Sequence, residues 1–388
     1  MNVLISGAGI AGLTLAFQLQ HAGHRVTLVE QAPSLRGEGY MIDFFGAGYD
    51  AAERMGLLPD LEPMHYPIGR LSFLREDGTR RFAVPYPAIR RLFDDRHFNF
   101  MRGDLEQAIF SRLESSLVPR YETTVTGLRQ DGPAVHATLS DGSAATYDLV
   151  VGADGIHSGV RALAFGPEAS YARYLGHRTA AFVLPELPAG LKDPDAFATL
   201  TVPGRQVAVY PIRGGRAATF FVHRAPEPPA DTSHPAALEE LRAVYSRLDW
   251  IVPALLEAAG GVSIYYDAVS QVVMPSWRSG RIVLLGDACQ CVSLLAGQGS
   301  SMAVYGAWVL AGELARAGDV EHALGRYEAR MRPAILKRQE AGRRMARWFV
   351  PDTRPRIFLR DLMMRMANWP LANRVLAHAL ASDSELRD

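Results

Sequence analysis

The amino terminus carries the pattern that most constrains what this chain can fold into. Residues 3–5 form a short apolar run, which is typical of a buried parallel strand. Gly7, Gly9 and Gly12 follow with the spacing G-x-G-x-x-G. Glycines at this spacing permit a tight turn, let a pyrophosphate approach the backbone, and let the next helix pack closely on the strand. The amino terminus of that helix would present free N–H groups and partial positive charge to the phosphates.

The next segment completes a nucleotide-binding unit. The helix is predicted to end near Gly23, and residues 25–29 form a second apolar strand that ends at Glu30. A carboxylate about 20 residues beyond the glycines can accept hydrogen bonds from ribose hydroxyls. Because the same carboxylate would repel a 2′-phosphate, the bound ligand is expected to be FAD or NAD rather than NADP.

Composition narrows the class of protein. The 388 residues suffice for one large or two ordinary domains, and the formal net charge is zero. No nucleic acid or anionic membrane is therefore expected as a partner. The two cysteines, Cys289 and Cys291, are separated by one residue and lack the partners of a metal site, so we expect them to be packed without a disulfide. No signal peptide or membrane-length apolar run is present, and a cytoplasmic location is expected.

The remaining chain divides by its pattern. Alternation over residues 71–84 predicts a hairpin, and antiparallel strands are predicted over 118–147. From about 170 to 275, short strands separated by proline and glycine turns predict a mostly antiparallel sheet, with a helical stretch at 236–259. The last third predicts a helix at 300–315, a long arginine-rich helix at 321–349 and a helical tail.

Three motifs stand in a specific order: the glycines of residues 7–12, Gly-Ala-Asp-Gly at 152–155 and Gly-Asp-Ala at 286–288. Together they resemble the single-component FAD-dependent monooxygenases of the para-hydroxybenzoate hydroxylase type, above all the tetracycline-inactivating branch. The resemblance covers the chain to about residue 348. It implies an α/β fold, in which a Rossmann-like FAD-binding domain carries an inserted, mostly antiparallel β-sheet substrate domain and a C-terminal helix.

The implied domain limits are residues 1–170 and 276–348 for FAD binding, 171–275 for the substrate sheet and 349–388 for a helical tail. The implied cofactor site combines the glycine turn with acids, arginines and a second glycine turn. Its expected members are Gly7, Gly9, Ile10, Ala11, Gly12, Glu30, Gln31, Arg36, Asp43, Arg102, Asp154, Gly155, Gly286, Asp287, Gly297, Gln298 and Gly299.

The resemblance also assigns roles within this set. Asp287 would bond an FAD ribityl or ribose hydroxyl, and Asp154 would serve the pyrophosphate. The amides of residues 297–299 would meet the flavin N1–C2=O edge, where negative charge collects on reduction. Arg102 would contact phosphate or ribityl, Arg36 would lie near FAD or the incoming NADPH, and Asp43 would be an FAD-contacting acid.

Alternative interpretations stay open for several of these residues. Asp154 and Asp287 also fit turn residues after strands, Arg36 and Arg102 fit surface ion pairs, and Asp43 fits a helix cap. His157 fits a loop or cap residue better than a catalytic base. For the sheet, Tyr210, Phe220, Tyr265 and Gln271 are the candidate pocket residues, with core packing as the alternative.

The chain departs from the family pattern beside the third motif. Gln290 stands at the usual histidine, Ser293 and Leu294 stand at two usual prolines, and Gly306 stands at a usual aspartate. Binding of flavin by backbone amides can survive these changes. These departures alter the detailed flavin environment and any proton path through the missing histidine.

The implied activity is that of an FAD-dependent monooxygenase. NADPH or NADH would reduce FAD, O₂ would add at flavin C4a to give a hydroperoxide, and its distal oxygen would pass to an aromatic or polyketide-like small molecule. The flavin carries this chemistry, which agrees with the lack of a paired-carboxylate or triad signature. An isoprenoid-chain reductase type of FAD enzyme and a non-catalytic flavin-binding protein are the alternatives. A monomer or weak homo-oligomer is expected.

Overall fold

The computed structural model describes residues 1–35, 39–191, 193 and 195–366, and in it the first apolar run is a strand, β1 (Asn2–Ser6). This strand lies in a five-stranded sheet with the order β16–β17–β10–β1–β2, parallel except for β16. The other strands are β2 (Arg25–Val29), β10 (Leu149–Gly152), β16 (Arg278–Ser279) and β17 (Ile282–Leu284). Residues 3–5 are fully buried because layers cover both faces of the sheet, as a parallel strand requires.

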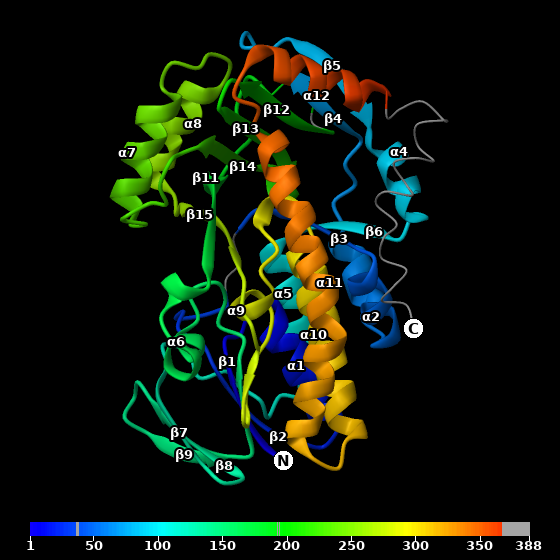
Figure 1. Ribbon diagram of the computed structural model, residues 1–388. Helices are drawn as coiled ribbons and strands as arrows, with labels where there is room; N and C mark the ends of the chain where they lie inside the picture. Colours follow the sequence, from blue (N-terminus) through cyan, green and yellow to red (C-terminus); the bar gives the residue numbers. More distant parts are fainter. Residues whose placement is uncertain (36–38, 192, 194, 367–388) are drawn as a thin grey trace.

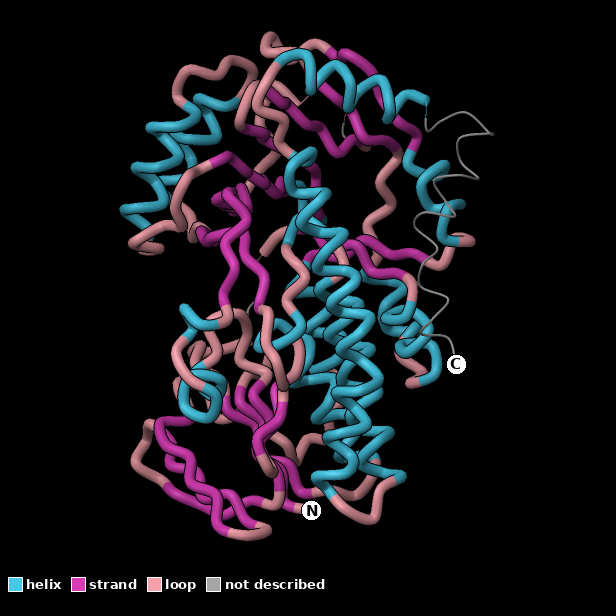
Figure 2. The backbone as a smooth tube through the Cα atoms, viewed as in Figure 1, coloured by secondary structure: helices cyan, strands magenta, loops and turns pink. Residues whose placement is uncertain are grey.

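Helices and a small sheet form these layers (Figures 1 and 2). Helix α1 (Ile10–His21) packs against α5 (Arg102–Phe110) and α10 (Gly299–Arg316), and α10 packs against α2 (Ala47–Arg54). The small sheet consists of β7 (Val125–Asp131), β8 (Ala134–Leu139) and β9 (Ala144–Tyr147), and it contacts α6 (Gly159–Phe165). The Rossmann-like organisation predicted from the glycine motif is confirmed.

A seven-stranded sheet forms the second lobe, with the order β15–β11–β14–β13–β12–β4–β5. Its strands are β4 (Arg70–Leu74), β5 (Arg80–Pro85), β11 (Ala172–Leu184), β12 (Ala196–Val202), β13 (Arg205–Ile212), β14 (Arg216–Arg224) and β15 (Tyr265–Val272). All pairs are antiparallel except β12 with β4.

The β4–β5 hairpin corrects the predicted limits of the substrate sheet. The resemblance places its residues in the first FAD-binding segment, yet they extend the sheet by a parallel pairing of β4 with β12. Local alternation predicts a hairpin but not which distant strand it joins. We retain the remaining domain limits as a proposal.

The two faces of the seven-stranded sheet have different neighbours. One face packs on α7 (His234–Tyr245) and α8 (Val252–Ala258) through residues such as Val207, Val209 and Phe221. The other face carries Tyr210 and lies toward α12 (Arg354–Met366), which crosses β5 and β12 (Figure 1). The predicted helix over 236–259 is therefore two helices, because residues 246–251 leave helical geometry and Trp250 has a positive φ of 61°.

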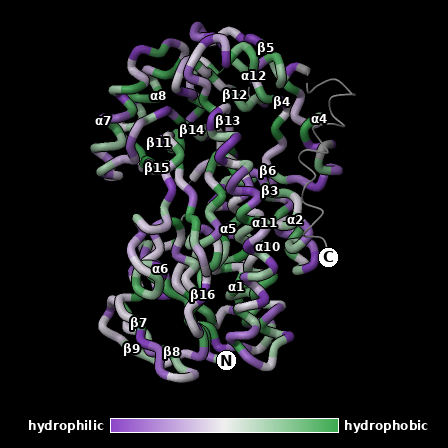
Figure 3. The backbone as a smooth tube through the Cα atoms, viewed as in Figure 1, coloured by the Kyte–Doolittle hydropathy of each residue, from purple (hydrophilic) through white to green (hydrophobic). Residues whose placement is uncertain are grey.

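The two lobes are joined by short strands and a long helix. Strand β3 (Met41–Phe45) pairs with β6 (His97–Met101), and α3 (Leu58–Leu61), α4 (Tyr86–Arg90) and α9 (Asp287–Gln290) complete the connections. The 30-residue helix α11 (Val320–Phe349) runs from one lobe to the other (Figure 1). Both hydrophilic and hydrophobic residues occur along it (Figure 3), and its buried residues recur at helical spacing.

None of the described helices combines the length and the apolar character that a membrane crossing requires. The expected tail helix is observed as α12, and residues 367–388 of the expected tail lie outside the described part of the chain.

Candidate functional site

A cavity of about 590 Å³ lies between the lobes. It extends from Gly9 at the amino-terminal turn to Arg360 on α12, and its walls come from the seven-stranded sheet, from the short strands over residues 41–45 and 97–101, and from the loop before α10. A volume of this size is in the range of cofactor and ligand pockets. The cavity joins segments that are far apart in the sequence.

In the first glycine turn, two glycines are required by the fold and the third leaves space for a ligand. Gly7 has a φ of 105°, and a Cβ there would lie 2.4 Å from the Ala153 carbonyl oxygen. A Cβ at Gly12 would lie 1.9 Å from the Gly7 oxygen. At Gly9 the nearest atoms to such a Cβ are 3.5 Å away, so the fold itself tolerates a methyl group there. Gly9 lines the cavity instead, where a pyrophosphate would need the space.

The amino terminus of α1 provides donors for that ligand. Gly9 is the N-cap of α1, no side chain caps the helix, and its first turn holds no acidic residue. Ile10 and Ala11 line the cavity together with Gly9. Uncapped N–H groups and the positive end of the helix dipole are suited to a phosphate. These residues therefore fit the pyrophosphate of FAD.

Glu30 fixes the backbone around this turn. Its Oε2 accepts a hydrogen bond from the Ala8 amide at 2.8 Å, and its Oε1 accepts one from the Ala32 amide at 2.8 Å. Gln31 is exposed, and Arg36 lies outside the described residues. The contact of Glu30 with a ribose stays a prediction, since its carboxylate is already an acceptor for two amides.

Opposite charges from α9 and α5 face the middle of the cavity. Gly286, with a φ of 62°, begins the turn into α9, and Asp287 then exposes its side chain to the cavity. Burial by the surrounding protein raises the pKa of Asp287, while the guanidinium of Arg102 opposes this rise. Arg102 also pairs with Glu106, with a distance of 2.8 Å between Nη2 and Oε1. Both residues are placed to bond hydroxyl or phosphate groups in this space.

A second uncapped helix meets the same cavity. Gly297 has a φ of 64°, in the left-handed region, and Gln298 is the N-cap of the 18-residue helix α10 without a side-chain cap. Gly297 and Gly299 line the cavity, whereas the side chain of Gln298 does not. The amides and dipole of α10 would favour negative charge on a ring placed there. This arrangement fits the role predicted for residues 297–299.

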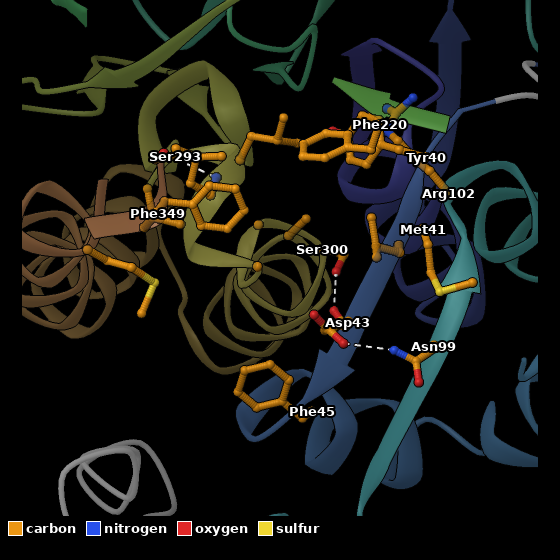
Figure 4. Close-up of a pocket in the computed structure, with 18 of the residues that line it drawn as sticks. Tyr40, Met41, Asp43, Phe45, Asn99, Arg102, Phe220, Ser293, Ser300 and Phe349 are labelled. Atoms are coloured by element: carbon orange, nitrogen blue, oxygen red, sulfur yellow. Dashed lines mark hydrogen bonds between the residues drawn. The ribbon is translucent and has the colours of Figure 1, made fainter. Parts of the chain in front are cut away.

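A polar cluster around Asp43 lies beside this helix (Figure 4). Asp43 Oδ1 accepts hydrogen bonds from Tyr86 Oη at 3.0 Å and from Asn99 Nδ2 at 2.8 Å, and His97 Nε2 lies 3.1 Å away. Ser300 Oγ donates to the Asp43 carbonyl oxygen at 3.1 Å. Asp43 therefore holds a network rather than a helix cap.

Sequence reasoning identified Asp43 but missed its three side-chain partners. Asn99 is the register partner of Asp43 in the β3–β6 pair, so a correct strand pairing would have found it. His97 lies two residues away on the same strand and on the same face. Tyr86 comes from α4, and no local pattern connects it to Asp43.

Three of the four sheet candidates line the cavity: Tyr210, Phe220 and Tyr265. The prediction is wrong for Gln271, which does not line the cavity. It is fully buried outside the cavity, and its Nε2 donates to the carbonyl oxygens of Val292 and Gln339, both at 2.8 Å. The pairing of β15 with β11 shifts register before Ser270, so the alternation that would place Gln271 beside Tyr265 is broken.

The carboxylate of Asp154 is also placed differently from the prediction. Ser158 Oγ donates to its Oδ1, and the Val160 amide donates to its Oδ2 at 3.0 Å. The side chain therefore stabilises the start of α6, as the turn-residue interpretation proposes. Its neighbours Ala153 and Gly155 line the cavity. The motif thus reaches the cavity through its backbone rather than through its acid.

The departures from the family pattern have a structural explanation. Gln290 is buried and donates from Nε2 to Tyr327 Oη at 2.5 Å. A Cβ at Gly306 would lie 2.8 Å from Gln290 Oε1, so Gln290 occupies the space beside the glycine. Ser293 has a φ of 105°, which proline cannot adopt because its ring holds φ near −65°. The loop that lines the cavity at Ser293 and Leu294 therefore follows a backbone path that a proline at Ser293 would forbid.

His157 links the second motif to the substrate sheet. Its Nδ1 lies 3.0 Å from Glu168 Oε1, and its Nε2 lies 3.2 Å from Asp267 Oδ2 on β15. The hydrogen bond to Asp267 raises the pKa of His157 to about 9, with support from Glu168. At neutral pH this residue is therefore a cation between two carboxylates, and a surface link rather than a base.

This link predicts a pH dependence of stability. Since the pKa of His157 is 6.5 in its ordinary state and about 9 in the fold, the stabilisation is complete below pH 6.5 and is lost as the pH rises toward 9. His157 is exposed, so we expect about 1 kcal/mol or less. The melting temperature of the apoprotein should therefore decrease between pH 6 and pH 9.5, and the His157→Gln substitution should remove this decrease. An equal decrease in the variant would contradict the assignment.

The chain is similar to known proteins in both sequence and structure. Residues 100–338 match the FAD binding domain family, and residues 5–54 match the NAD(P)-binding Rossmann-like domain family. The Mycobacterium tuberculosis protein Rv1260 is 33% identical over 369 residues, covering 91% of this chain and 94% of the relative. A flavin-dependent monooxygenase from an unknown prokaryotic organism is 30% identical over 90% of this chain and 91% of the relative. The crystal structure of tetracycline destructase Tet(51) superposes with a TM-score of 0.84 at 25% identity, covering 97% of both chains.

Proposed function

The chain belongs to the FAD-binding family of flavin-dependent monooxygenases, and from this premise we propose that it oxygenates an aromatic or polyketide-like small molecule held between the flavin and the seven-stranded sheet. FAD is the cofactor, and NADPH or NADH is the co-substrate.

One observation carries the proposal: two uncapped helix amino termini line the same cavity. Gly9 to Ala11 at the start of α1 suit a pyrophosphate, and Gly299 at the start of α10 suits the N1–C2=O edge of a flavin ring, where negative charge collects on reduction. Asp287 and Arg102 line the cavity as well and supply the polar contacts that a ribityl chain needs. The residues present therefore fit an extended dinucleotide.

Bound FAD would accept a hydride from the nicotinamide, activate O₂ and deliver one oxygen atom to the substrate. The chain's own part is to bind, orient and exclude water. The amides of α10 would hold the negative charge that reduction places on the ring. Apolar walls that include Phe220, Val292 and Leu295 limit the access of water to the reacting groups.

Two finer expectations belong to the proposal. The first is that the enzyme acts as a monomer or weak homo-oligomer. Both cysteines are free and buried, as is usual where thiols stay reduced, which supports a cytoplasmic location. Size-exclusion chromatography with light scattering would test the first expectation.

Asp287→Asn provides a test of the cofactor site. We expect the dissociation constant of FAD to rise about tenfold or more, the loss typical of a hydrogen bond to a charged group. Because burial raises the pKa of Asp287, removing its charge should leave the apoprotein at least as stable as the wild type. Asp60→Asn, at a surface ion pair with Arg112, is the matched control and should bind FAD normally. Equal FAD affinity in Asp287→Asn and the wild type would contradict the role.

The function itself is tested by coupling. Purified enzyme loaded with FAD is screened against aromatic and polyketide compounds for substrate-stimulated NADPH oxidation, O₂ uptake and a mass gain of one oxygen atom. Stimulated consumption with that mass gain supports the proposal. Consumption that yields only hydrogen peroxide with every compound would favour a reductase or a non-catalytic flavoprotein.

A further inference from the structure

The end of the cavity that is formed by the sheet and α12 contains a buried cation. Arg360 lines the cavity with only 8% of its surface exposed. Gln206 on β13 also lines it and is also 8% exposed. The other walls at this end are mainly apolar and include Leu71, Phe73, Phe197 and Met364. A guanidinium in such surroundings requires compensation.

The hydrogen bonds of Arg360 compensate it only in part. Its Nη1 lies 3.3 Å from Gln206 Oε1 and 3.2 Å from the Phe349 carbonyl oxygen. Its Nη2 lies 3.2 Å from Thr201 Oγ1 and from Asp361 Oδ1. Charge-assisted bonds are usually about 2.7–2.9 Å long, so these four are long. Within the described part of the chain, the buried Nε has no acceptor.

Charge is also unbalanced at this end. Asp361 is the carboxylate partner of Arg360, and the other oxygen of Asp361 pairs with Arg81 at 2.7 Å. Two guanidinium groups therefore share one carboxylate, and the pair leaves one positive charge in excess. Burial lowers the pKa of Arg360, which agrees with an incompletely neutralised cation.

Gln206 adds neutral donors beside this charge. Its Oε1 accepts from Thr201 Oγ1 at 3.0 Å and from Arg360. These contacts orient the side-chain amide, so the acceptor oxygen faces Arg360 and the two N–H groups of Nε2 are not used by the described residues. The cavity end therefore presents positive charge and unused donors, and a group with two acceptor oxygens would match both.

We propose that Arg360 and Gln206 form a specificity subsite for a carboxylate at one end of an otherwise apolar, planar substrate. This inference rests on the proposed function, because it names the kind of substrate that the same cavity would take. The carboxylate would bond the amide of Gln206 and offset the excess charge of Arg360, while the ring system would lie along the apolar walls.

The test compares two probes that differ only in charge. Anthraquinone-2-carboxylate and anthraquinone-2-carboxamide are titrated into enzyme loaded with oxidised FAD, without NADPH, and binding is measured by isothermal titration calorimetry. We expect the wild type to bind the carboxylate about tenfold more tightly than the carboxamide, as one charge-assisted contact provides. Equal affinities, or a preference for the carboxamide, would overturn the inference.

Two variants test which residues cause the preference for the carboxylate probe. Arg360→Gln should lose it, with weaker binding of the carboxylate and unchanged binding of the carboxamide. Gln206→Glu keeps an acceptor for Arg360 but places a second carboxylate in the subsite. The new carboxylate can pair with Arg360, so we expect the variant to fold and to lose the preference. Arg356→Gln, on the same helix but in a surface pair with Asp352, is the matched control and should keep the preference. A preference that persists in Gln206→Glu would overturn the inference even if Arg360→Gln failed to fold.

Failure of the inference is distinguishable from failure of the proposed function. The FAD content of each preparation is measured from the pigment released on denaturation, before any probe is added. A wild-type protein that binds FAD and oxygenates a substrate, yet shows no carboxylate preference, would refute only the subsite. A wild-type protein that cannot be loaded with FAD would refute the function on which the subsite depends.

Discussion

Gly9→Ala is expected to fold normally but to purify without FAD. A Cβ at this position would have 3.5 Å of clearance from Arg102 and Glu106, so the apoprotein has room for it. The methyl group would instead occupy the space in which a pyrophosphate approaches the α1 amides. Losing two hydrogen bonds to a charged group, each about 1.5–3 kcal/mol, would weaken FAD binding by roughly a hundredfold or more. Absorbance of bound flavin and thermal melting of the apoprotein are the two measurements.

Gly12→Ala is the matched comparison within the same turn. Its Cβ would lie 1.9 Å from the Gly7 carbonyl oxygen, so this variant should lose folding as well as FAD. The two glycines therefore separate ligand binding from folding at positions three residues apart. A yellow Gly9→Ala protein with wild-type FAD content would refute the placement of the pyrophosphate at α1.

Gly306→Asp should reduce the free energy of unfolding by about 3–5 kcal/mol, the cost typical of a buried charge without a partner. The usual family residue at this position is an aspartate, so the substitution restores the family pattern. In this chain, however, a Cβ at residue 306 already lies 2.8 Å from Gln290 Oε1. Both the charge and the added volume would then be forced against a buried amide. Urea denaturation of the apoprotein measures the loss.

The double variant Gln290→His, Gly306→Asp tests why the loss occurs. An imidazole at residue 290 removes the crowding and can pair with the new carboxylate, so we expect a favourable coupling energy of about 1–3 kcal/mol. Gly312→Asp, on the same helix with Arg316 beside it, is the control and should cost little. Additive losses in the double variant would show that Gln290 and Gly306 are not a coupled exchange.

The sequence was sufficient for features that depend on local pattern. The spacing of Gly7, Gly9 and Gly12 requires a strand, a turn and a helix, because larger residues cannot occupy Gly7 or Gly12. Alternation with a period of two predicted the antiparallel strands, and the apolar run at residues 3–5 predicted a strand covered on both faces. Glycine turns before α1 and α10 likewise predicted two helix amino termini, and both line the cavity.

Tertiary structure decided where individual side chains point and which distant segments meet. A register shift in the β11–β15 pair turns Gln271 out of the cavity, and the start of α6 engages the carboxylate of Asp154. Tyr86 reaches Asp43, and Arg360 reaches the sheet, across loops that carry no periodic signal. The period of a segment depends on its own backbone geometry, whereas the direction and partner of a polar side chain depend on burial and hydrogen bonds between segments that only the assembled fold brings together.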